Sequence, residues 1–121
     1  MSKTITDVKI KTYKAVPDEN IRARAIIGNG QKGGWAMLLN DQHIKGGTAS
    51  QWVPLGVAQD LVGKALEVSA VMMDVQANTN KLSLGVEVEG DADLRVAISH
   101  VGGDGDSAAY SIFVKFEKKV P

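Results

Sequence analysis

Alternation of apolar and polar residues with a period of two runs through most of this chain. Between residues 82 and 88, leucine and valine alternate with serine, glycine and glutamate, and the runs 94–99 and 110–116 repeat the pattern. Successive side chains of a β-strand point to opposite faces, so this period is typical of strands with one buried face. It therefore predicts a predominantly β-sheet protein.

Short turn-forming segments separate these runs. The segment 17–20 reads Pro-Asp-Glu-Asn, 28–34 contains four glycines, and 102–107 is again rich in glycine and aspartate. About eight short strands at such spacing are typical of an antiparallel β-sandwich. We expect an all-β sandwich of jelly-roll-like or C2-like type, formed as a single domain from residues 1–121. Alternation alone does not specify which strands pair.

Residues 57–75 fit two patterns. A helical stripe of apolar residues begins at Val57, but Gly63 interrupts it, and 66–72 alternates as a strand does. We expect at most one short helical turn near residues 57–62, over Ala58–Leu61, followed by a strand from Lys64 to Val75. The alternative is a two-layer α+β fold.

The first predicted strand has Thr6, Val8, Ile10 and Thr12 on one face. Asp7, Lys9 and Lys11 form the other face, which we expect to be the wet one. A second strand begins at Ile21 and presents two arginines on its charged face.

Charge and composition limit the classes of function. Fourteen basic and fourteen acidic residues cancel, so no strong field attracts nucleic acid. No apolar stretch approaches the roughly 18 residues of a membrane helix. The absence of cysteine removes disulfides and thiolate chemistry. The first residues lack an apolar run, so we expect a cytoplasmic protein, or one exported without a cleavable N-terminal signal.

Two tryptophans suggest a carbohydrate ligand. Trp52 follows Gln51 in a loop-rich segment, and Trp35 follows two glycines. An exposed indole can stack on the apolar face of a sugar ring while neighbouring amides and carboxylates bind its hydroxyls. Trp52, Gln51, Trp35 and the turn residues Asn40 and Asp41 are therefore the candidate ligand-binding residues. Core packing is the competing role of each tryptophan.

Acidic loops suggest a calcium site. If successive strands alternate in direction, the loops at 18–20, 40–41, 78–80 and 104–106 meet at one end. The glycine loop 28–34, the turn 59–63 and Asp91 and Asp93 meet at the other end. Carboxylate and amide oxygens are the ligands that calcium prefers. Asp104, Asp106 and Asp18 are the candidate ligands, although Asp-Gly is also a common hairpin turn.

The histidines give little support to an enzyme. His43 and His100 lie far apart in the sequence, and no Gly-x-Ser-x-Gly nucleophile motif is present. We expect a non-catalytic binding or assembly module, most concretely a lectin-like carbohydrate-binding protein that requires no cofactor. A self-associating structural subunit, a homo-oligomer without a small ligand, is the alternative. A small hydrolase or isomerase using a histidine and a carboxylate is the third hypothesis.

Overall fold

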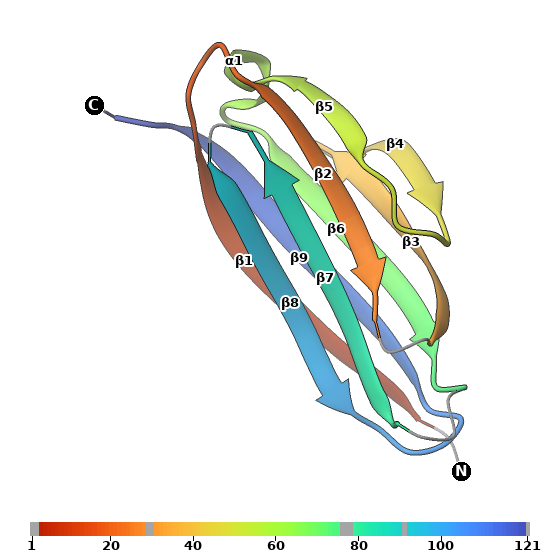
Figure 1. Ribbon diagram of the computed structural model, residues 1–121. Coiled ribbons are helices and arrows are strands. Elements are labelled where there is room, and N and C mark those ends of the chain that lie inside the picture. Colours follow the sequence, from red (N-terminus) through yellow and green to blue (C-terminus); the bar gives the residue numbers. More distant parts are fainter. Residues whose placement is uncertain (1–2, 29–30, 76–78, 91, 121) are drawn as a thin grey trace.

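Two twisted sheets pack face to face in this protein (Figure 1). The computed structural model describes residues 3–28, 31–75, 79–90 and 92–120. One sheet has five strands in the order β1-β9-β6-β3-β4, and the other has four in the order β5-β2-β7-β8. The predicted all-β sandwich is therefore confirmed.

The described residues form nine strands and one helix of four residues. The five-stranded sheet contains β1 (Thr4–Ala15), β3 (Lys32–Leu39), β4 (Gln42–Gly47), β6 (Ala65–Met73) and β9 (Ser107–Lys118). The four-stranded sheet contains β2 (Asn20–Ile27), β5 (Val53–Val57), β7 (Lys81–Glu89) and β8 (Asp93–Val101). The helix α1 spans Ala58–Leu61, as predicted, and β6 lies within the strand expected over residues 64–75.

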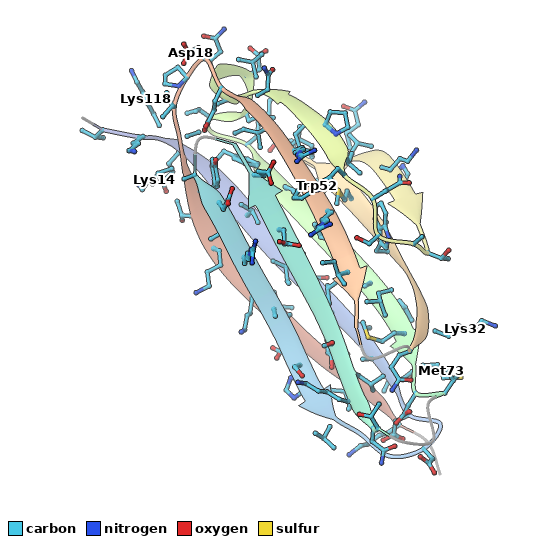
Figure 2. The ribbon with its side chains drawn as sticks, in the orientation of Figure 1. Lys14, Asp18, Lys32, Trp52, Met73 and Lys118 are labelled. Carbon is cyan, nitrogen blue, oxygen red and sulfur yellow. The ribbon has the colours of Figure 1, made fainter. Side chains whose placement is uncertain are left out.

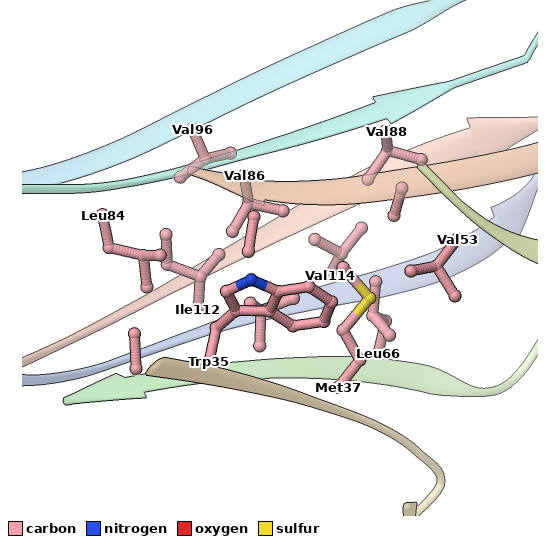
Figure 3. Packing of buried hydrophobic residues seen from close by; sticks show 14 of the residues in the cluster. Trp35, Met37, Val53, Leu66, Leu84, Val86, Val88, Val96, Ile112 and Val114 are labelled. Atoms are coloured by element: carbon pink, nitrogen blue, oxygen red, sulfur yellow. The ribbon is translucent and has the colours of Figure 1, made fainter. Parts of the chain in front are cut away.

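The inner faces of the two sheets form one continuous core (Figure 3). Alternation places every second residue of β6, β7 and β9 inside, among them Leu66, Leu84 and Ile112, all completely buried. Burying such a side chain contributes about 1.5–3 kcal/mol relative to leaving it in water. The repeated period of two thus sets both the strands and the face that each turns inward.

β1 differs from the prediction in two ways. It pairs with β9 in parallel along its whole length, from Thr4 opposite Ser107 to Ala15 opposite Lys118, so the sheet is mixed. Its faces are also reversed: Tyr13 and Ala15 are buried, which turns the odd-numbered positions toward the other sheet. Val8 and Ile10 consequently lie on the outer face, more than half exposed.

The reason lies at the open edge of the sandwich, where β1 runs close to β8. Lys9 Nζ donates to the carbonyl oxygen of Ala97 at 2.7 Å, and Asp7 Oδ2 lies 2.7 Å from His100 Nε2. The polar residues of β1 therefore join the two sheets along this edge. Polar contacts with β8, together with the burial of Tyr13, decide the orientation of the strand.

Strand directions determine which connections share an end. The connections β1–β2, β3–β4, β5–β6 and β7–β8 lie at one end of the sandwich, called here the α1 pole because it carries the helix (Figure 1). The connections β2–β3, β6–β7 and β8–β9 lie at the opposite end. The predicted grouping of acidic loops is therefore wrong. Asp18 and Asn40 lie at the α1 pole, Asp104 lies at the opposite pole, and Asn78 and Asp91 fall outside the described residues.

Candidate functional site

The outer face of the four-stranded sheet carries a ladder of arginine and glutamate side chains. β2 contributes Arg22 and Arg24, β7 contributes Glu87 and Glu89, and β8 contributes Arg95. The strand register places Arg22 opposite Glu89 and Arg24 opposite Glu87, and Glu87 opposite Arg95. Because these positions alternate with core residues, all five side chains point away from the other sheet.

Glu87 is the centre of this ladder. Its Oε1 accepts a hydrogen bond from Arg24 Nε at 2.7 Å, and its Oε2 lies 3.0 Å from Arg95 Nε. The Glu87 side chain is only 15 % exposed, whereas that of Arg95 is 76 % exposed. The Glu87 carboxylate therefore fixes two planar guanidinium groups. That of Arg95 keeps most of its hydrogen-bond donors in water.

Trp52 lies beside this ladder, immediately before β5 (Figure 2). The guanidinium carbons of Arg22 and Arg24 lie over its ring, 4.2 Å and 4.5 Å from the ring centre. Positively charged guanidinium groups are attracted to the negative face of an indole. Trp52 is half-buried, so the arginines hold the ring in place while part of it remains accessible to solvent.

A shallow hollow lies next to the ladder on the same face. Its volume is about 300 Å³, and it is lined by Ile26, Gly85, Ala97 and the two ends of the Glu87–Arg95 pair. In the register, Ile26 is opposite Gly85 and Gly85 is opposite Ala97, one outward position along from Arg24, Glu87 and Arg95. Because Gly85 has no side chain, the bottom of the hollow is apolar. Glu87 and Arg95 line one of its sides.

Trp35, by contrast, belongs to the core. It is buried, and its Nε1 donates to the carbonyl oxygen of Ala49 at 3.1 Å. That bond anchors the segment that crosses from β4 in one sheet to β5 in the other. Trp35 thus holds this crossing from the inside and is not available as a binding platform.

The other residues predicted to bind a carbohydrate are divided between the two sheets. Asn40 and Asp41 form the tight β3–β4 turn, where both have positive φ angles of 50° and 67°. Asn40 also bonds the backbone of Ala65, so its amide serves the five-stranded sheet. Gln51 is exposed and adjacent to Trp52. The five predicted residues therefore lie in separate places: Gln51 and Trp52 before β5, Asn40 and Asp41 in the β3–β4 turn, and Trp35 in the core.

The predicted calcium ligands do not meet either. Asp18 lies beyond the end of β1 at Ala15, whereas Asp106 binds the backbone at the start of that strand. Twelve residues of extended chain separate these ends by about 40 Å. Among the described residues, no group of three or more histidine, aspartate or glutamate side chains is arranged to hold a metal ion.

Asp106 has a structural role in the β8–β9 turn. It is buried, and its carboxylate accepts hydrogen bonds from the backbone nitrogens of Gly103 at 2.7 Å and Lys3 at 2.9 Å. These two bonds, that from Gly103 foremost, lower the pKa of Asp106. Asp104 instead faces the Asn80 amide, whose nitrogen is placed to donate to Asp104 and Asp74 at 2.9 Å and 2.8 Å.

The imidazole of His100 pairs with the carboxylate of Asp7. The enzyme hypothesis depends on a histidine–carboxylate pair of this kind. The bond between His100 and Asp7 lowers the pKa of that carboxyl group. The imidazole also lies against the Tyr110 ring, with centroids 5.8 Å apart. His100 lines neither the hollow at Gly85 nor the one at Gly34. His43 is exposed on the edge strand β4. The His100–Asp7 pair joins β1 to β8.

Sequence reasoning missed the Arg–Glu ladder. Alternation correctly places Arg22 and Arg24 on a charged face, and it does the same for Glu87 and Glu89. It does not show that β2 and β7 are neighbours, because about 60 residues separate them in the chain. The signal that could have suggested the pairing is charge: two arginines two residues apart, and two glutamates with the same spacing.

Comparison with family models, with curated proteins and with solved structures found no match to this chain. Among the described residues, no helix is long and apolar enough to cross a membrane.

Proposed function

We propose that this protein is a non-catalytic carbohydrate-binding module, and that its sugar site is the outer face of the four-stranded sheet. The observation that carries the proposal is the combination of a half-exposed indole, planar charged groups and an apolar-floored hollow on one rigid face. Sugars offer alternating apolar and hydroxyl-rich surfaces, so a site for them needs both kinds of group.

The Arg–Glu ladder supplies the polar half of such a site. Guanidinium groups have donors in a fixed planar arrangement, and carboxylates accept bonds from two hydroxyls. Because Glu87 already positions Arg24 and Arg95, these groups lose little side-chain entropy when a ligand binds. No metal ion is required for this chemistry.

The dimensions favour a ligand longer than one sugar ring. The hollow of about 300 Å³ is at the lower end of the usual range for small-ligand sites. The ring of Trp52 lies against Arg22 and Arg24. The hollow begins at Ile26, the next outward position after Arg24 on β2 and about 7 Å from it. A disaccharide or longer glycan spans both features, with one ring at Trp52 and the next over Gly85.

A glycan array followed by calorimetric titration of its hits tests the proposal. Trp52→Ala and Gly85→Val should each weaken binding at least tenfold, since the first removes the platform and the second fills the hollow. Ser99→Val is the matched control, because Ser99 is an exposed position on the neighbouring strand β8 and does not line the hollow. A silent array, or binding unaffected by both site variants, would contradict the proposal.

A further inference from the structure

We propose that the outer face of the five-stranded sheet is the interface of a symmetric homodimer, in which a second copy of this chain packs sheet against sheet. This surface lies on the opposite side of the sandwich from the proposed sugar site. It is called the apolar face below and is centred on β1, β9 and β6.

Exposed apolar side chains are concentrated on this face. Ile10 is 59 % exposed and Val71 63 %, and Val8 and Met73 are also more than half exposed. Phe113 lies opposite Ile10 in the register and is half-buried. Because β1, β9 and β6 are adjacent strands, these residues form one surface. Monomeric proteins rarely expose a contiguous apolar patch of more than a few hundred Å².

The polar side chains at the centre of the apolar face are already paired with one another. Ser69 Oγ donates to Glu67 Oε2 at 2.7 Å, and it lies 3.1 Å from Ser111 Oγ. At the margins, Thr4 Oγ1 and Ser107 Oγ share a hydrogen bond. A polar group that keeps its partner costs much less to bury than one that loses it. Ser69 and Ser111 can therefore be covered without losing their hydrogen bonds.

The apolar face carries both projecting side chains and a recess, a combination that a second copy of the same face can use. A hollow of about 300 Å³ lies beside the projecting side chain of Val71. It is lined by Gly34, Ala36, Gly47 and Ser69. A two-fold interface uses the same patch on both subunits, so each patch must carry both projections and recesses. The net charge of zero also removes long-range repulsion between copies.

The area is sufficient for a stable dimer. A face five strands wide and eight residues long at β3 covers about 600 Å² in projection, given the usual strand spacing and rise. Two copies therefore bury about 1,200 Å², the lower limit for a specific interface, before surface relief is included.

Association through the edge at β1 is opposed by charge. Lys9 and Lys11 lie on the inner side of this edge strand, and Lys9 is bonded to β8. Inward-pointing lysines on an edge strand are a common obstacle to pairing with another chain. The β1 edge is consequently less suited to a second copy than the sheet face.

Sedimentation equilibrium over a range of concentrations tests the proposal on the unmodified chain. We expect a species of twice the monomer mass of 12.9 kDa. Ile10→Lys and Val71→Lys should each raise the dissociation constant at least tenfold. Val101→Lys is the control, because Val101 is 77 % exposed but lies at the end of β8, outside the apolar face. Circular dichroism confirms that each variant remains folded.

Several results would overturn the proposal. One is a wild-type protein that stays monomeric at hundreds of micromolar, and another is a dimer that survives both face variants. A monomer that floats with phosphatidylcholine vesicles, and loses this property on Val71→Lys, would assign the face to a lipid surface instead. A nitroxide label on Met73→Cys gives an independent measurement, since the chain has no other cysteine. Dipolar coupling between labels is expected in the dimer, and it should report a shorter distance than in the matched Val101→Cys protein, whose label lies on the other sheet.

Discussion

The guanidinium carbon of Arg22 lies 4.2 Å from the centre of the Trp52 ring, and the same side chain donates to Glu89. Arg22 therefore joins the segment before β5 to the end of β7. An exposed cation–π contact of this kind contributes about 0.5–1 kcal/mol.

A double-mutant cycle measures that contribution. We expect Arg22→Ala and Trp52→Ala to show a coupling of about 0.5–1 kcal/mol in urea unfolding, because each removes one partner of the contact. The control cycle combines Trp52→Ala with Arg95→Ala, since Arg95 pairs with Glu87 on the far side of the ladder. Equal coupling in both cycles would show that the Arg22–Trp52 contact has no specific role.

Gly85→Val should stabilise the protein while it blocks the hollow. A β-carbon added at Gly85 would lie 3.8 Å from the Ile26 Cβ, an ordinary contact. Glycine inside a strand costs about 0.5–1 kcal/mol relative to alanine, and valine favours strands further. We expect the free energy of unfolding to rise by about 0.5–1 kcal/mol. A fall instead would mean that the floor of the hollow is more tightly packed than the structure indicates.

Gly33→Ala should destabilise the protein, whereas the same substitution at the neighbouring Gly34 should not. A β-carbon at Gly33 would lie 2.3 Å from the carbonyl oxygen of Val71 and 2.8 Å from the Met72 Cβ, so β3 and β6 would have to separate. Such overpacking costs about 1–3 kcal/mol. At Gly34 the nearest atom is 3.5 Å away, and Gly34→Ala is the matched control. Thermal unfolding of the two variants compares them directly, and similar melting temperatures would refute the argument.

Acidification should weaken the fold through three carboxylates. Hydrogen bonds lower the pKa of Asp7, Asp106 and Glu117 in the folded protein, with His100, Gly103 and Lys14 as their respective main donors. A carboxyl group with a lowered folded pKa stabilises the protein above its unfolded pKa, near 4 for these residues. That stability is lost as the pH falls through the folded value.

Asp106→Asn isolates one of these groups. We expect the variant to melt a few degrees lower than the wild type at pH 7, with a shallower loss of melting temperature between pH 5 and pH 2. The bonds from Gly103 and Lys3 to a charged acceptor are the physical reason. Parallel melting curves of the two proteins across this range would contradict that role.

The sequence predicts individual strands of this fold better than their arrangement. Alternation around Leu84 and Ile112 identifies β7 and β9 because their inner faces are uniformly apolar. At β1 the same reasoning fails, since its orientation depends on Tyr13 entering the core and on Lys9 reaching β8. Both are long-range contacts that a local pattern does not contain.

The candidate site also combines a residue that the local sequence reveals with one that only the strand arrangement reveals. The indole of Trp52 is recognisable in the sequence from its loop-rich surroundings, whereas Glu87 is one acidic residue among fourteen. Glu87 becomes notable only when β2 and β8 are placed on either side of β7. Trp35 is the contrasting case: of its two predicted roles, the structure has the core packing, because the chain folds over the ring.

The parallel pairing of β1 with β9 has a consequence for how the protein is made. β1 lies at the edge of its sheet and β9 is the strand bonded to it, yet about 100 residues of chain separate them. The ribosome must therefore synthesise Ser107–Lys118 before β1 can pair with its neighbour in the sheet. Until then the backbone of β1 has no strand beside it, and an unpaired strand is open to pairing with other chains.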